Sequence, residues 1–320
     1  MMRGIAITGP TASGKTSLSI FLADALGGEI ISMDSMQIYE GMDIGTAKAT
    51  VEEQAKIPHH LLDICKPSQA FSAKDYRDAA IPVAKEICSR GKIPIFVGGT
   101  GLYLSTLMRN DSDEVPPSDK EFREKLLVKA DTEEGRIALW KRLEAVDSES
   151  AGKVHYNNAR RVIRALEIYE KTGKTKSFYD KKSLLSPPEI NITHITVDFH
   201  DRETLYERIN ERVDAMMRAG LWEEVSSLYE AGELQNNSTA AQAIGYKEII
   251  RAITERKAKD AAVEEIKQAS RNYAKRQLTW FRKAGAAVLF ADGEDGRIKS
   301  GEEIFAETLE ILCAEGFNIP

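Results

Sequence analysis

A glycine-rich segment near the start of the chain is the strongest chemical signal in the sequence. It matches the pattern G-x-x-x-x-G-K-[ST] and consists of Gly9, Pro10, Thr11, Ala12, Ser13, Gly14, Lys15 and Thr16. Glycines in this pattern let backbone N–H groups and the N-terminus of the following helix point at an anion. Lys15 adds a positive charge and Thr16 offers a hydroxyl to Mg²⁺. We therefore expect residues 9–16 to bind a diphosphate or a nucleotide.

Two further polar residues follow apolar, strand-like runs. Asp34 comes directly after the run 30–33, and Thr100 follows the run 93–97 together with a pair of glycines. Because the carboxyl ends of parallel strands meet at one edge of a sheet, both side chains should face the crevice that holds the glycine-rich segment. Asp34 would then be a general base or a Mg²⁺ ligand, with a solvated turn residue as the third alternative.

Two arginines lie four residues apart on a predicted helix. Arg208 and Arg212 therefore share one face of that helix. Such a pair can clamp a leaving diphosphate. The alternative is ion pairing with Glu211 or Asp214 on the surface, and the residues alone favour this alternative.

The elements that must position these residues alternate along the chain. Short apolar runs and amphipathic stretches follow one another as in βαβ units around a parallel sheet. The predicted strands are 4–8, 30–33, 93–97, 192–199 and 287–290, and the predicted helices are 15–26, 72–90 and several between 202 and 283. This order predicts an α/β fold, in which a P-loop NTPase-like parallel sheet is flanked by helices.

Two proline pairs divide the chain. Pro116-Pro117 and Pro187-Pro188 bracket a mostly helical region, and paired prolines are poor helix or strand interiors. We therefore expect an inserted, mainly helical domain at 111–189. Residues 1–110 and 190–320 would form a discontinuous catalytic core.

Composition excludes several classes of protein. The three cysteines show no CxxC spacing, so disulfides and thiolate metal sites are not expected. No signal peptide and no membrane span is predicted, which places the protein in the cytoplasm. The net charge is −6, yet residues 153–182 are rich in bases and residues 267–283 contain no acid. Two basic strips on an acidic protein predict that a polyanion docks at one place.

Several segments resemble the bacterial tRNA dimethylallyltransferases, also called isopentenyl-tRNA transferases. The resemblance runs along almost the whole chain. Its most specific segments are DSMQIYEGMDIGTAK at 34–48 and KRQLTWFR at 275–282. Further matching segments are GPTASGKT at 9–16, PHHLLD at 58–63, FSAKDYR at 71–77, VGGTGLY at 97–103, RRVIRALE at 160–167, RVD at 212–214 and AIGYKE at 243–248.

The resemblance implies a prenyl transfer. The loop would hold the diphosphate of dimethylallyl diphosphate with Mg²⁺ present, and Lys15, Thr16 and Arg212 would stabilise the leaving diphosphate. The allylic carbon would be attacked by N6 of the adenosine on the 3′ side of the anticodon. Asp34 would take the proton of this weakly nucleophilic amine, and Thr100 would help to position it. Preorganised charge at the leaving group would contribute most to the rate.

The resemblance also implies contacts with the tRNA anticodon stem-loop, made by a monomeric enzyme. Bases of a single-stranded loop are recognised by extraction into pockets and by stacking. The implied contact residues are Asp34, Ser35, Met36, Gln37, Thr100, Arg123, Arg160, Arg161, Val162, Ile163, Arg164, Gln242, Ala243, Ile244, Gly245, Tyr246, Lys247, Lys275, Arg276, Gln277, Leu278, Thr279, Trp280, Phe281 and Arg282.

Three other functions compete with this hypothesis. A small-molecule kinase fits the loop and the sheet, but no kinase-type arginine lid is recognisable and the segment 275–282 would go unexplained. An isopentenyltransferase acting on free adenine nucleotides uses the same chemistry, whereas the basic helix at 160–167 favours a polymeric acceptor. A GTP-binding switch protein needs an N-K-x-D motif, which the sequence lacks.

Overall fold

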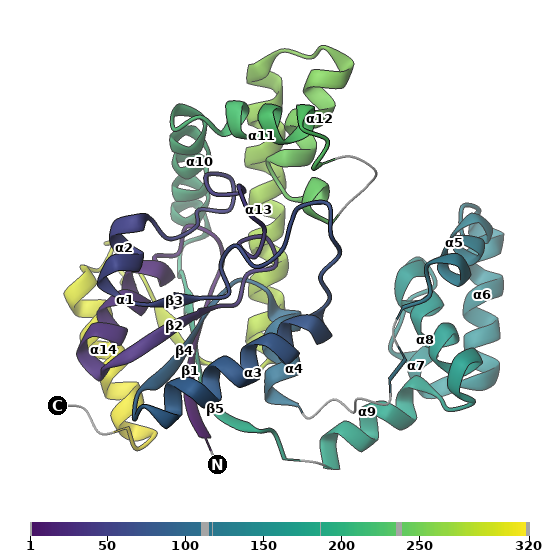
Figure 1. Ribbon diagram of the computed structural model, residues 1–320, viewed down its shortest axis with the longest axis horizontal. Coiled ribbons are helices and arrows are strands. Elements are labelled where there is room, and N and C mark those ends of the chain that lie inside the picture. Colours follow the sequence, from purple (N-terminus) through teal and green to yellow (C-terminus); the bar gives the residue numbers. More distant parts are fainter. Residues whose placement is uncertain (1, 110–114, 117, 186, 235–238, 318–320) are drawn as a thin grey trace. The chain divides into compact units, whose positions relative to one another are not determined.

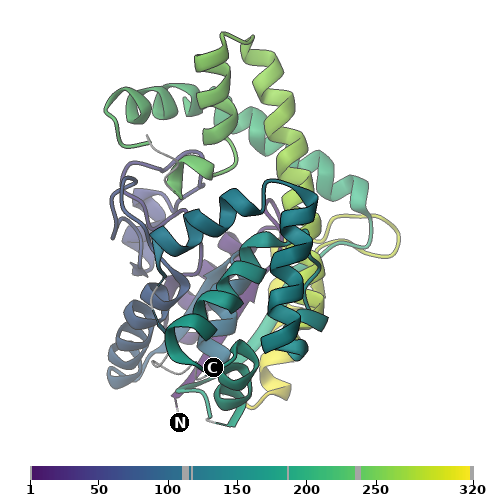
Figure 2. The same ribbon diagram turned by 90° about the vertical axis from the view of Figure 1, so that its right-hand side faces the viewer.

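The computed structural model describes residues 2–109, 115–116, 118–185, 187–234 and 239–317. The chain forms two compact units (Figures 1 and 2). Unit 1 combines Met1–Met108 with Glu189–Pro320, and unit 2 is Arg109–Pro188. The domain boundary predicted at residue 111 lies outside the described residues, as do Pro117 and Ser186 at the predicted borders.

Unit 1 is built on a parallel sheet of six strands, which confirms the predicted α/β fold. Its order is β3-β2-β4-β1-β5-β6, and every neighbouring pair is parallel. The strands are β1 (Met2–Thr8), β2 (Gly28–Ser32), β3 (His59–His60), β4 (Ile93–Gly98), β5 (Ile190–Asp198) and β6 (Ala287–Phe290). The two-residue strand β3 has no counterpart among the predicted elements, because two histidines carry no apolar signal.

Helices cover both faces of this sheet (Figure 1). Along β1, Ile5 and Ile7 pack into one core with helices α1, α10 and α14, whereas Ala6 between them packs into the opposite core with α3 and α4. This alternation follows from the two-residue period of a strand. The helices of unit 1 are α1 (Lys15–Leu26), α2 (Val51–Lys56), α3 (Ala73–Ser89), α4 (Gly101–Met108), α10 (Arg202–Arg218), α11 (Leu221–Glu230), the 3₁₀ helix η1 (Ala240–Gln242), α12 (Tyr246–Glu255), α13 (Lys259–Lys283) and α14 (Gly301–Ala314).

A third core lies beyond the carboxyl ends of the strands. It combines residues of α10, α11, α12 and α13 with Ile38, Tyr39 and Met42 from the segment after β2. The long helix α13 passes from this core to the sheet, since Ile266 packs in the third core and Leu278 in the core of the sheet. One helix therefore connects the strand ends to the helices above them.

Unit 2 is a helical bundle with its own core (Figure 2). Its helices are α5 (Lys120–Lys129), α6 (Glu133–Val146), α7 (Ser148–Gly152), α8 (Ala159–Thr172) and α9 (Lys176–Leu185). Val162, Ile163 and Leu166 make the apolar face of α8 and are buried. In the described part of the chain, no helix is long and apolar enough to cross a membrane.

Candidate functional site

Residues 9–16 form a loop that joins β1 to α1. Gly14 precedes the helix with φ 87°, and no side chain of the described residues caps the first N–H groups of α1, which can therefore bind an anion. Gly9 has no room for a side chain, because a Cβ would lie 2.7 Å from the carbonyl oxygen of Val197. The loop therefore presents backbone donors where the sequence predicts a bound phosphate.

Two cations and one carboxylate influence each other beside this loop. Burial, and then the charge of Arg212, lower the pKa of Lys15 to about 8, against the opposing effect of Asp34. Burial also lowers the pKa of Arg212, and Asp34 again opposes the shift. Arg212 Nε is buried and has no hydrogen-bond partner among the described residues. Such a buried donor is costly until an acceptor binds it, and an anion in the loop would be such an acceptor.

The surface ion pairs favoured for Arg208 and Arg212 are wrong. Arg208 Nε donates to the carbonyl oxygen of Ala12 at 3.1 Å, and Asp214 pairs with Lys267 at 2.9 Å. Arg212 lines a cavity instead. Helical spacing shows that the two arginines share a face, but it cannot show that this face packs against the loop.

Asp34 and Thr100 meet at the carboxyl ends of β2 and β4. Asp34 Oδ1 accepts the backbone N–H of Met36 at 2.9 Å, and Thr100 Oγ1 accepts the backbone N–H of Ser35 at 3.0 Å. The backbone N–H of Thr100 donates to the carbonyl oxygen of Met33 at 3.2 Å. These bonds tie the two strand ends together, and among the described residues no protein group donates a hydrogen bond to the second oxygen of the Asp34 carboxylate.

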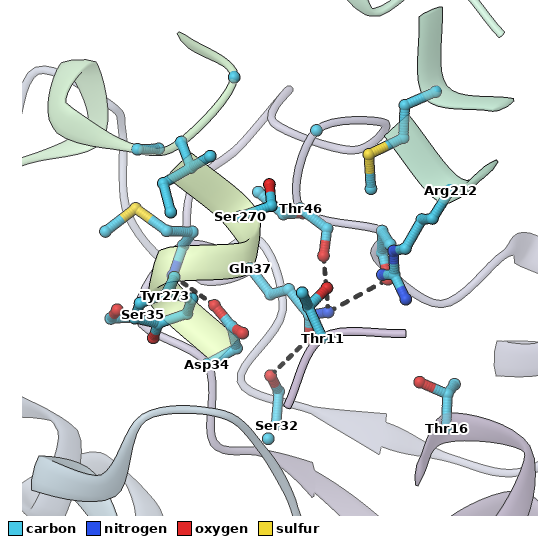
Figure 3. A pocket seen from close by; sticks show the side chains of 18 of the residues that line it. Thr11, Thr16, Ser32, Asp34, Ser35, Gln37, Thr46, Arg212, Ser270 and Tyr273 are labelled. Carbon is cyan, nitrogen blue, oxygen red and sulfur yellow. Dashed lines mark hydrogen bonds between the residues drawn. The ribbon is translucent and has the colours of Figure 1, made fainter. Parts of the chain in front are cut away.

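A cavity of about 350 Å³ opens above the strand ends (Figure 3). Lys15, Thr16 and Arg212 line one part of it, and Asp34 lines the same space. A second hollow of about 640 Å³ shares Lys15, Thr16 and Arg212 with the first. These three side chains therefore face both hollows, where a bound diphosphate could reach them.

Helix α13 supplies further lining residues. Gln277 is buried, its Oε1 accepts the backbone N–H of Thr11 at 3.2 Å, and its Nε2 donates to the carbonyl oxygen of Gly99 at 3.0 Å. It thus holds the phosphate-binding loop to the end of β4. Burial, and then the charge of Asp34, raise the pKa of Tyr273 to about 12. Sequence analysis does not single out Tyr273 or Ser270 as site residues, although Tyr273 lies two residues before the matching segment 275–282.

The segment 242–247 forms another wall of the cavity. Gln242, Ala243, Ile244, Gly245 and Lys247 line it. Tyr246 is fully buried, and its hydroxyl donates to Glu224. Of the residues predicted to contact tRNA in this segment, all except Tyr246 therefore line the cavity.

The last part of α13 has both exposed and buried positions. Lys275, Arg276 and Thr279 are exposed, whereas Leu278 and Phe281 are buried. Arg282 pairs with the buried carboxylate of Asp198 at 3.0 Å. The exposed positions are those available to a polyanion.

In unit 2 the predicted arginines fall into two groups. Arg160 and Arg161 are exposed, and no ion pair is found for either in the described residues. Arg123 and Arg164 both bond to the fully buried Glu167, at 2.8 and 2.5 Å. Asp119 donates its backbone N–H to the same carboxylate, so Glu167 connects α5 with α8.

The described residues contain no group of three or more His, Cys, Asp or Glu side chains that could hold a metal ion. A protein cage for a divalent cation is therefore not present among them. Thr16 lines both openings beside the loop. Its hydroxyl fits Mg²⁺, since this ion is usually held by few protein oxygens together with substrate phosphates and water.

Comparisons with known proteins agree on one family. The family model described as IPP transferase matches residues 37–284. A tRNA dimethylallyltransferase of Thermoanaerobacter sp. (strain X514) is 48% identical over 87% of this chain and 88% of its own length. That of Shouchella clausii (strain KSM-K16) is 47% identical over 98% of both chains.

Solved structures extend this similarity to the fold. The crystal structure of a tRNA isopentenylpyrophosphate transferase from Staphylococcus epidermidis has 41% identity and a TM-score of 0.70, and covers 99% of this chain and 100% of that one. A eukaryotic dimethylallyltransferase acting on tRNA has 30% identity and a TM-score of 0.80, over 100% of this chain and 81% of that one.

Proposed function

We propose a reaction for this chain, which belongs to the IPP transferase family and has tRNA dimethylallyltransferase activity. The enzyme transfers the dimethylallyl group of dimethylallyl diphosphate to N6 of the adenosine on the 3′ side of the anticodon, and diphosphate leaves. The observation that carries this proposal is the single cavity lined by the phosphate-binding loop, Arg212 and Asp34.

The donor binds through its diphosphate to the loop. The free N–H groups at the start of α1 and the side chains of Lys15 and Arg212 neutralise the negative charge that grows as the C–O bond to the allylic carbon breaks. Thr16 would hold Mg²⁺ beside the diphosphate, and the ion would add positive charge there when bound. The unpartnered Nε of Arg212 supports this assignment, because the leaving group supplies the missing acceptor.

Asp34 acts as the general base. Adenine N6 shares its lone pair with the ring, so it attacks only as its proton is removed. One Asp34 oxygen is fixed by the N–H of Met36, which leaves the carboxylate oriented toward the cavity with an oxygen available for that proton. Thr100 holds the backbone at Ser35 and thereby positions Asp34. The new C–N bond forms on N6 while the allylic C–O bond breaks.

The tRNA anticodon stem-loop binds to exposed, positively charged side chains of the enzyme. Lys275 and Arg276 on α13, with Gln242 and Lys247 at the cavity wall, support contacts near the extracted adenosine. Arg160 and Arg161 support a phosphate contact by unit 2. We propose that the enzyme acts as a monomer, and we place it in the cytoplasm with its substrate tRNA.

The test of this function uses labelled dimethylallyl diphosphate with Mg²⁺. Unmodified tRNA, AMP and ATP are offered in turn as acceptors. We expect label in tRNA alone, at the adenosine 3′ of the anticodon. Label in AMP would instead identify an enzyme of free nucleotides, and transfer of the γ-phosphate of ATP would identify a kinase.

The role of Asp34 is tested by Asp34→Asn. The amide keeps the hydrogen bond to Met36 but cannot take a proton, so kcat should fall by about 10² to 10⁴. The dissociation constant of dimethylallyl diphosphate, measured by calorimetry, should change by less than about threefold. The matched control is Asp24→Asn on the exposed side of α1. An equal loss of donor binding would instead make Asp34 a metal ligand or a structural residue.

A further inference from the structure

The segment between Asp43 and Ala47 forms a wall of the cavity without contributing a charged side chain to it. Gly45, Thr46 and Ala47 line the cavity. The segment has no regular secondary structure, and Ala47 has a left-handed φ of 47°. Local turn bonds such as that from the backbone N–H of Ala47 to the carbonyl oxygen of Ile44 shape it, and side chains from elsewhere hold it against the rest of the cavity.

One such side chain is Gln37, which holds the end of the segment nearest β2. Its Nε2 donates to the carbonyl oxygens of Thr46 at 3.1 Å and Ala47 at 3.2 Å (Figure 3). Its Oε1 accepts the hydroxyl of Ser32 at 2.8 Å. Both the oxygen and the nitrogen of the Gln37 side-chain amide are thus hydrogen-bonded.

Glu224 on α11 holds the other end. Its Oε2 accepts the backbone N–H groups of Asp43 at 2.9 Å and Ile44 at 2.7 Å, and its Oε1 accepts that of Gly45 at 3.1 Å. The hydroxyl of Tyr246 donates to the same Oε1 at 2.5 Å. Burial, and then the charge of Glu224, raise the pKa of Tyr246, so this phenol remains a donor.

The four donors require a carboxylate. An ionised carboxylate accepts at both oxygens, whereas an amide accepts at one and would place its NH₂ against backbone N–H groups. Gly45 completes the fit, since a Cβ there would lie 2.4 Å from the ring of Tyr246 and 2.8 Å from Leu221. Hydrogen bonds to a charged group contribute more to stability than neutral ones, so this carboxylate fixes the wall firmly.

We propose that Glu224 is a positioning residue for the acceptor, because it fixes the wall formed by residues 43–47 against the wall formed by residues 242–247. The inference rests on the proposed function, in which this cavity receives the adenosine. Glu224 itself is absent from the lining of the cavity and from the loop at residues 9–16. Its loss should therefore affect the acceptor and spare the donor.

The test compares Glu224→Gln with Glu223→Gln. Glu223 is its exposed neighbour on α11 and lies 3.7 Å from Lys259, so it is a matched control. For Glu224→Gln, the KM for tRNA should rise about tenfold or more, while the dissociation constant of dimethylallyl diphosphate changes by less than about twofold. Glu223→Gln should change neither quantity. Tyr246→Phe removes one of the four donors and should raise the KM for tRNA by about threefold.

The remaining outcomes overturn the inference. An unchanged KM for tRNA in both Glu224→Gln and Tyr246→Phe would show that the wall needs no anchor. If Glu224→Gln does not fold and Tyr246→Phe weakens donor and acceptor binding equally, then Glu224 has only a structural role. A failure of the proposed function looks different, because the wild-type enzyme would then label AMP and not tRNA.

Discussion

Arg212 offers the sharpest test of the site, because one substitution should have opposite effects on stability and on binding. Its Nε is buried without a partner in the described residues, and its charge lowers the pKa of Lys15. The unpaired donor and the repulsion between the two cations both destabilise the folded enzyme without a ligand. A bound anion would accept the hydrogen bond and attract both cations. We therefore expect Arg212→Met to stabilise the free protein and to weaken binding of the donor.

The size of each effect follows from the contacts. Leaving a buried polar group unpaired costs about 1–3 kcal/mol. Because Arg212 is partly exposed, we take the low end of this range, about 1 kcal/mol, as the cost for its Nε. For a chain of this length, that corresponds to a rise in Tm of about 2 °C. Loss of a charged partner to the diphosphate costs about 2–3 kcal/mol, which weakens donor binding about 30- to 150-fold.

The assay combines thermal unfolding without ligand and calorimetric titration with dimethylallyl diphosphate. Arg251→Met is the control, since Arg251 is exposed on α12 and lines neither hollow beside the loop, and it should change the Tm little and the affinity by less than about threefold. A lower Tm for Arg212→Met would show that Arg212 stabilises the free protein. Unchanged donor affinity would show that it does not bind the diphosphate. Either result would refute the reasoning.

Two further predictions concern Lys15 and the strand ends. Because the pKa of Lys15 is about 8 and an anion binds its protonated form, donor affinity should be constant below pH 8 and fall up to about tenfold per pH unit above it. Titrations from pH 7 to 10 check this, and in Arg212→Met the fall should begin at a higher pH. Gly98→Ala places a Cβ 2.1 Å from the carbonyl oxygen of Met33, next to Asp34, and should lower the free energy of unfolding by about 3 kcal/mol in denaturant titrations. Gly301→Ala meets nothing within 4 Å and should leave it nearly unchanged.

Local sequence patterns were enough to predict the parallel sheet and the phosphate-binding loop. The helix predicted at 15–26 and the strand at 287–290 agree with the structure residue by residue, since apolar spacing and the glycines at 27 and 28 act locally. Other elements carry weak local signals. Sequence analysis does not identify α2, α4 or α14, which are short or lie beside irregular segments.

The sequence by itself determined the α/β order, the phosphate-binding loop and the place of Asp34 and Thr100 at neighbouring strand ends, because these follow from short-range periodicity and parallel topology. Only the tertiary structure decided the partners of the long side chains. It directs Arg212 into the cavity, joins Gln277 to the loop and brings Glu224 to the backbone of residues 43–45. Each of these contacts spans a long stretch of chain, and the packing of whole helices fixes which face of a helix meets which loop.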